Sequence, residues 1–225
     1  AVSSFELLMN KADQLKDLSD FNSYSVSTDQ PTVLAADADS NALSGSHQIQ
    51  VSSLAREQRT NLTPNGASSF SSKTQIINAG NSFDLAIAIG NSSPVTNTVT
   101  VRSATPQGIV DAINNAGLEV TAHLMDTGSS GSAYIIQLVG QSGTEQQYSV
   151  TPSVNSLLDA NTPSGQTAAD ASLTVNGVSF TRPTNNISDI VEGVNLKLTG
   201  TTSGTANLAI IRDTKTTEAN IKEFV

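Results

Sequence analysis

Cysteine and tryptophan are both absent from the 225-residue sequence, and charged residues make up only 14% of it. Because there is no cysteine, neither a disulfide framework nor a thiolate metal site can form. No apolar run approaches the ~20 residues that a membrane-spanning helix requires. The first residues, AVSSFELLMNK, also lack the basic and then apolar segments of a secretory signal peptide. If the protein acts outside the cell, we therefore expect export without a classical signal peptide, or a signal outside this sequence.

Basic residues are few and scattered. The net charge is -9, and no two lysine or arginine residues are adjacent. A surface with this balance repels the phosphate backbone of nucleic acids. Anionic membrane surfaces are disfavoured for the same reason. We therefore expect neither nucleic acid nor a membrane as a partner.

Serine, threonine, asparagine and glycine are abundant instead, as in proteins built of many short strands joined by turns. The segment DASLTVNGVSFTRPTNNISDIVEGVNLKL, residues 170–198, contains two alternating apolar runs, a candidate helix and a third alternating run. Asn176-Gly177 joins the first two runs and is the strongest short signal for a β-hairpin. Residues 84–124 carry a weaker copy of this order. The pattern predicts a strand–strand–helix–strand unit that occurs twice.

Each copy contains one candidate helix. In the first, Thr105 is a suitable N-cap and Pro106 occupies the first helical position, where its missing N–H costs nothing. In the second, Asn186 is the candidate cap and Asp189 takes the capping-box position. The predicted core stripes of the two helices are Ile109, Val110 and Ile113, and Ile187, Ile190 and Val191.

The two ends of the chain show helical periodicity. Apolar residues recur at steps of three and four over residues 1–19, and a second periodic pattern begins after residue 213. A short amphipathic helix needs a packing partner. We therefore expect the two ends to meet in one helical stalk, with everything between them as an insertion. The residues expected to pack in it are Phe5, Leu8, Leu15, Ile221 and Phe224.

Candidate catalytic residues are few. A nucleophilic triad needs a base, and the only histidines, His47 and His123, lie inside alternating strand patterns. Asp37 and Asp39 are the best carboxylate pair, but they share one loop and match only part of a calcium-binding loop. We therefore predict no enzymatic activity, no cofactor and no metal site.

Three segments resemble one family. They are HQIQVSSLAREQ (residues 47–58), AADASLTVNGVSFTRPTNNISDIVEGVNLKL (residues 168–198), and LAIIRDT followed by Ile-x-x-Phe-Val (residues 208–225). In order and spacing they are similar to the flagellar filament cap proteins, also called hook-associated protein 2. The Ala-Ile-Asn sequence at residues 112–114 also resembles a motif of flagellar hook and filament proteins.

The resemblance implies an α+β fold that is mostly β. It has two β-rich head modules, each with a short helix, one inserted in the other, on a partial helical leg. The expected leg comprises residues 1–21 and 213–225. The expected inner head domain comprises residues 22–77 and 166–212, and the expected outer, inserted head domain residues 78–165. On this resemblance the chain is a head-domain fragment of a longer protein.

The resemblance also implies a function. The chain is expected to be the head region of a homo-oligomeric ring at the extracellular tip of the bacterial flagellar filament. There it would act as a non-enzymatic assembly factor that promotes flagellin polymerisation and prevents flagellin loss. A low-charge surface rich in hydroxyl and amide groups leaves one alternative open, a surface adhesin that binds host mucin or glycan.

Overall fold

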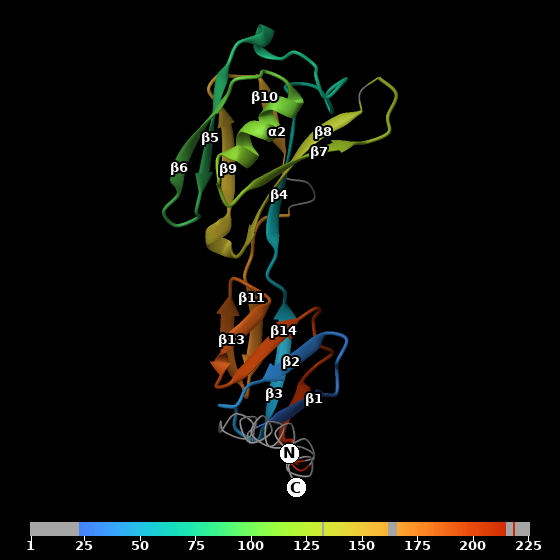
Figure 1. Ribbon diagram of the computed structural model, residues 1–225, viewed down its shortest axis with the longest axis vertical. Helices are drawn as coiled ribbons and strands as arrows, with labels where there is room; N and C mark the ends of the chain where they lie inside the picture. Colours follow the sequence, from blue (N-terminus) through green and yellow to red (C-terminus); the bar gives the residue numbers. More distant parts are fainter. Residues whose placement is uncertain (1–22, 132, 162–165, 215–217, 219–225) are drawn as a thin grey trace, which may run out of the picture. The chain divides into compact units, whose positions relative to one another are not determined.

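The computed structural model describes residues 23–131, 133–161, 166–214 and 218 (Figure 1). Its contacts divide the chain into two units. The first, which we call the split unit, comprises Ala1–Leu54 and Ala171–Val225. The second, the inserted unit, is the continuous segment Ala55–Asp170. The mostly β fold and the insertion of one module into the other are therefore confirmed.

The split unit contains two antiparallel sheets, and alternation along their strands leaves one face of each sheet buried. In β3, for example, Ile49 and Val51 are buried while their neighbours in the strand are exposed. The five-stranded sheet has the order β1 (Tyr24–Thr28), β15 (Ala206–Arg212), β3 (Gly45–Ser53), β11 (Ala171–Val175) and β12 (Val178–Arg182). The three-stranded sheet has the order β13 (Asn186–Val191), β14 (Val194–Leu198) and β2 (Leu34–Ala38).

The helix predicted at residues 186–192 is wrong, because this segment is strand β13 and pairs with β14. A register shift between Ile187 and Val191 makes the strand irregular, so its apolar residues fall at the spacing of a helix. Branched side chains favour a strand here, and Gly193, at φ +69°, supplies the turn into β14. Ile187 is buried, whereas Ile190 and Val191 are only half-buried. The second strand–strand–helix–strand copy therefore does not exist.

The described residues of the inserted unit form two further antiparallel sheets and one α-helix, α2 (Pro106–Asn115). Short 3-10 turns, η2 (Asn78–Gly80) and η3 (Thr144–Gln146), lie in its connections. The four-stranded sheet has the order β10 (Leu158–Asn161), β4 (Glu57–Pro64), β8 (Tyr134–Ser142) and β7 (Thr121–Asp126). The three-stranded sheet has the order β6 (Val95–Val101), β5 (Phe83–Ile89) and β9 (Tyr148–Pro152).

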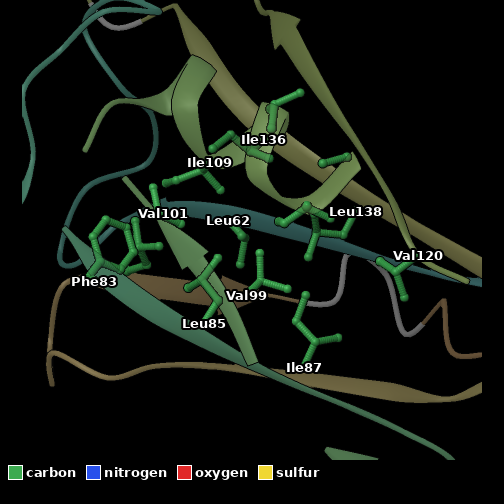
Figure 2. Close-up of a cluster of buried hydrophobic side chains, with 14 of the residues drawn as sticks. Leu62, Phe83, Leu85, Ile87, Val99, Val101, Ile109, Val120, Ile136 and Leu138 are labelled. Carbon is green, nitrogen blue, oxygen red and sulfur yellow. The ribbon is translucent and has the colours of Figure 1, made fainter. Parts of the chain in front are cut away.

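Helix α2 begins where the sequence places it. The Thr105 hydroxyl accepts a hydrogen bond from the Gly108 N–H at 3.1 Å, so one otherwise unpaired N–H of the first turn is satisfied. Ile109 and Ile113 are fully buried and Val110 is nearly so. Figure 2 shows Ile109 among side chains from both sheets, so that helix and sheets share one core.

Asn114, near the end of α2, extends the hydrogen bonding of the four-stranded sheet. Its side-chain amide donates to the carbonyl of Ala122 at 2.9 Å and accepts from the N–H of Ala122 at 2.8 Å. Since β7 is the edge strand of this sheet, the amide pairs backbone groups that no neighbouring strand pairs. The Ala-Ile-Asn sequence thus supplies one core residue, Ile113, and one residue, Asn114, whose side chain forms hydrogen bonds with the outer edge of β7.

The boundary between the units lies at 54/55 and 170/171, whereas we predicted 77/78 and 165/166. Strand β4 accounts for most of the difference, because it pairs with β8 and β10 of the inserted unit. The residues predicted to pack in the helical leg, Phe5, Leu8, Leu15, Ile221 and Phe224, lie outside the described part of the chain. Within that part, no helix is long and apolar enough to cross a membrane.

Candidate assembly surface

An apolar groove of about 350 Å³ lies in the split unit, beside β12 and β13. These two strands are edge strands of their respective sheets. Its polar lining residues are His47, Asn176 and Glu192. Its apolar lining residues are Leu43, Val175, Val178, Phe180, Ile190 and Val191. We call this feature the edge groove.

The β11–β12 hairpin forms one wall of the edge groove. Asn176 and Gly177 adopt φ values of +51° and +82°, as a two-residue hairpin turn requires. The Asn176 side-chain oxygen accepts from the N–H of Gln48 at 2.9 Å, and the Asn176 N–H donates to the Gln48 carbonyl at 2.8 Å. The Asn176 amide nitrogen lies 3.1 Å from Nδ1 of His47. The hairpin tip is therefore held against β3 by both backbone and side chain.

An ion pair joins the two strand edges that flank the groove. Arg182 of β12 donates from Nε to both carboxylate oxygens of Asp189 in β13, at 3.0 and 2.9 Å. These hydrogen bonds hold the pKa of Asp189 below its ordinary value. The Arg182 guanidinium also lies 5.6 Å from the centroid of the Phe180 ring. Because the Asp189 side chain is 60% exposed, the pair orients the strands more than it stabilises them.

Large apolar side chains remain exposed at the rim of the groove. Leu43 is 70% exposed and Val178 is 57% exposed. In an antiparallel edge strand, alternate residues direct their N–H and C=O away from the neighbouring strand. Counting from the hairpin pair Val175–Val178, these residues in β12 are Ser179 and Thr181. The groove thus combines an apolar floor with a strand edge, an arrangement suited to contact with another polypeptide.

Among the described residues of the inserted unit, the large apolar side chains that remain exposed include Val95, at 65%, and Ile76, which is the most exposed at 71%. The backbone on either side of it is fixed. The Ile77 N–H donates to the Ala104 carbonyl at 2.9 Å, and the Lys73 carbonyl accepts from the Gln107 N–H at 3.0 Å. We call residues 73–76 the anchored loop, because both of its ends are bonded to the segment that starts α2.

The residues considered for catalysis lie on separate elements, except that Asp37 and Asp39 together line a hollow of about 220 Å³ in the split unit. His47 lines the edge groove, whereas His123 is in β7, with Nε2 3.5 Å from the Thr121 hydroxyl. Asp39 caps a turn by accepting from the Asn41 N–H at 2.7 Å. Among the described residues, no three histidine, cysteine, aspartate or glutamate side chains are grouped to hold a metal ion.

Sequence reasoning did not find the edge groove or the anchored loop. Leu43 and Ile76 lie in polar stretches that read as turns or connectors, and Val178 looks like an ordinary strand residue. The one available signal was the Asn-Gly turn, which fixes the position of the hairpin but not which of its sides is covered.

Two family models match the two ends of the chain. The model described as Flagellar hook-associated protein 2 N-terminus matches residues 2–58. The model described as Flagellar hook-associated protein 2 C-terminus matches residues 168–225. Between them they cover almost all of the split unit and its boundaries with the inserted unit.

Two curated relatives support the same assignment. The flagellar hook-associated protein 2 of Helicobacter pylori is 44% identical over 62 residues, which cover 27% of this chain and 9% of that protein. The B-type flagellar hook-associated protein 2 of Pseudomonas aeruginosa is 28% identical over 217 residues, covering 86% of this chain and 44% of that protein. The chain therefore spans less than half the length of these relatives.

Solved structures show the same fold. The crystal structure of the flagellar cap protein FliD from Escherichia coli matches 99% of this chain and 67% of its own, with a TM-score of 0.79 and 25% identity. FliD from Pseudomonas aeruginosa matches 86% of this chain and 90% of its own, with a TM-score of 0.64 and 24% identity. The family models at both ends of the chain and the fold match along its length indicate the same family. The chain belongs to the flagellar hook-associated protein 2 family, the family of the flagellar cap proteins.

Proposed function

We propose that this chain is the head region of a cap at the tip of the bacterial flagellar filament, outside the cell. In this role the whole protein promotes flagellin polymerisation and prevents the loss of flagellin, and it catalyses no reaction. The observation that carries the proposal is the fold match over 99% of the chain to a flagellar cap protein, together with family models at both of its ends.

Strand pairing near the two ends of the described chain supports a leg made of two segments that leave the head next to each other. Tyr24 of β1 pairs with Arg212 of β15, and the Asp213 N–H donates to the Ser23 carbonyl at 2.8 Å. The two ends of the described part of the split unit, Ser23 and Asp213, therefore lie side by side. We propose that residues 1–21 and 213–225 form part of a helical leg, packed through Phe5, Leu8, Leu15, Ile221 and Phe224.

The base of the inserted unit is closed in a similar way. Arg56 and Ala169 exchange two backbone hydrogen bonds, of 2.9 and 3.0 Å, directly beside the two points where the chain passes between the units. An insertion held at its base in this way keeps its own core while its neighbour folds separately. This arrangement supports the proposed division of the head into an inner and an outer module.

A cap has to bind copies of itself and flagellin, and we propose both as partners. The edge groove supports this, because its exposed apolar rim and the edge strand β12 suit a protein partner. Export without a classical signal peptide is part of the same proposal. For the adhesin alternative, the described residues offer no observation that favours a glycan over a protein surface.

A complementation experiment tests the proposed function. A bacterial strain that lacks its cap gene would be supplied with the full-length parent protein, and swimming and unpolymerised flagellin in the medium would be measured. We expect swimming to return and the released flagellin to fall to the wild-type level. The proposal fails if the parent protein is exported and folded but flagellin is still lost. A strain carrying an empty vector is the matched control.

A further inference from the structure

We propose that the edge groove of one copy receives Ile76 and Lys73 from the anchored loop of a second copy. This inference rests on the proposed function, because it names a surface through which copies of the head associate. The two partner surfaces lie on different units of the chain, so the contact joins unlike surfaces of two copies.

The first argument is the match between an apolar hollow and an apolar side chain. The groove offers Phe180, Ile190 and Val191 along its floor, and Ile76 is 71% exposed. Exposed apolar side chains that occur singly are common on protein surfaces, but one held on a fixed loop loses little conformational freedom on binding. The backbone bonds at Lys73 and Ile77 provide that fixation.

The second argument is charge. Glu192 lies at the groove, whose lining contains no lysine or arginine, and Lys73 is three residues before Ile76. Both side chains are exposed, and no ion pair joins either of them to another residue in the described part of the chain. In a chain with a net charge of -9, charge repulsion opposes contact between two copies, and a cation that faces an anion reduces that repulsion. Lys73 facing Glu192 is such a pair.

The third argument concerns symmetry. If two grooves met face to face about a two-fold axis, the same patch would face itself, and each copy would bring Glu192 into the contact. No basic residue of the groove would offset that repulsion. Contact between a loop and a groove avoids this repulsion. It also leaves one loop and one groove free on each pair of associated copies. Further copies can then add, and the series closes into a ring if the rotation allows.

The experiment uses the 225-residue chain and measures self-association by sedimentation velocity over a range of concentrations. We expect reversible association that is weakened at least tenfold by Lys73→Glu, by Glu192→Lys and by Ile76→Asp. An equal mixture of Lys73→Glu and Glu192→Lys should associate better than either variant alone, because two reversed charges then meet. Lys197→Glu is the matched control, since it makes the same charge change at an exposed position outside the groove. Circular dichroism establishes that each variant is folded.

Three results would overturn the inference. One is a chain that stays monomeric up to about 1 mM, where even weak specific contacts are populated. Another is a mixture of the two charge variants that associates no better than its components. The last is Val178→Asp weakening association while Ile76→Asp does not, since the groove would then receive another segment. Each result leaves the proposed function standing, because rescue of the cap-null strain by the parent protein is measured separately.

Discussion

Replacing Ile113 with alanine tests whether α2 is essential to the core of the inserted unit. The side chain is fully buried, within a cluster that joins the helix to both sheets (Figure 2). The substitution removes three carbon atoms, and at ~0.8 kcal/mol for each buried CH₂ group this amounts to about 2.4 kcal/mol. A residual cavity of roughly 50–80 Å³ adds about 1–2 kcal/mol, at about 24 cal/mol per Å³. We therefore expect a loss of about 3.5–4.5 kcal/mol in the free energy of unfolding.

Urea unfolding followed by far-ultraviolet circular dichroism measures this loss, because the chain has no tryptophan to report on it. With a slope of about 1.5 kcal/mol per molar urea, the midpoint should fall by about 2.3–3 M. If the two units unfold in separate transitions, only that of the inserted unit should move. Asn115→Ala, at an exposed position on the same helix, is the control and should change stability by less than about 0.5 kcal/mol. A loss below about 1 kcal/mol for Ile113→Ala would refute the assignment of α2 to the core.

Three further predictions concern single sites. Burial raises the pKa of Tyr148 from 10.0 to about 12. The tyrosine therefore loses its proton at lower pH in the unfolded chain than in the folded one, and the inserted unit should lose stability as pH rises from about 10 to 12. Tyr148→Phe should flatten that decline in unfolding experiments, and an unchanged pH profile would contradict the reasoning. Asn114→Ala leaves the N–H and C=O of Ala122 unpaired and should cost about 1–3 kcal/mol in urea unfolding, whereas a neutral result would show that water replaces the amide. Gly193 has a φ of +69°, and Gly193→Ala places a Cβ 2.3 Å from the backbone nitrogen of Ala42. Thermal unfolding should therefore show the split unit destabilised by about 2 kcal/mol or more. An unaltered melting temperature would mean that the turn relaxes freely.

Local chemistry explains the features that the sequence predicted correctly. The Asn176-Gly177 hairpin forms because its two residues tolerate positive φ. Helix α2 begins at Pro106 because Thr105 and Pro106 suit the first turn whatever the surroundings. The resemblance to the cap proteins rested on the order of such segments, and the comparisons confirm it.

Pairing between distant strands explains where the prediction differed. Strand β4 reads as a polar connector because Gln58, Thr60 and Thr63 are buried although they are polar. The Gln58 amide donates to the Tyr148 carbonyl at 2.6 Å and accepts from the Tyr148 N–H at 3.2 Å, so its burial depends on a strand 90 residues away. No pattern of hydrophobicity reveals that partner, and the first boundary between the units was therefore predicted too late in the chain.

In strand β13, the local sequence pattern predicted the wrong secondary structure. The apolar spacing of Ile187, Ile190 and Val191 suits one face of a helix, and Asn186 and Asp189 suit a helix cap. Hydrogen-bonded pairing with β14 makes the segment a strand instead. A segment of six residues is too short to be a stable helix without tertiary support, so its neighbours determine its conformation.

The amino-acid sequence by itself determined the family, the predominance of strands, the hairpin and the capped helix, because each of these depends on residues close together in the chain. Only the tertiary structure decided which strands pair, where the two units divide and which apolar side chains remain uncovered. An edge strand and a central strand have the same alternation, and they differ only in whether a distant segment supplies the missing hydrogen bonds. For that reason the edge groove and Ile76 became visible only once the sheets were assembled.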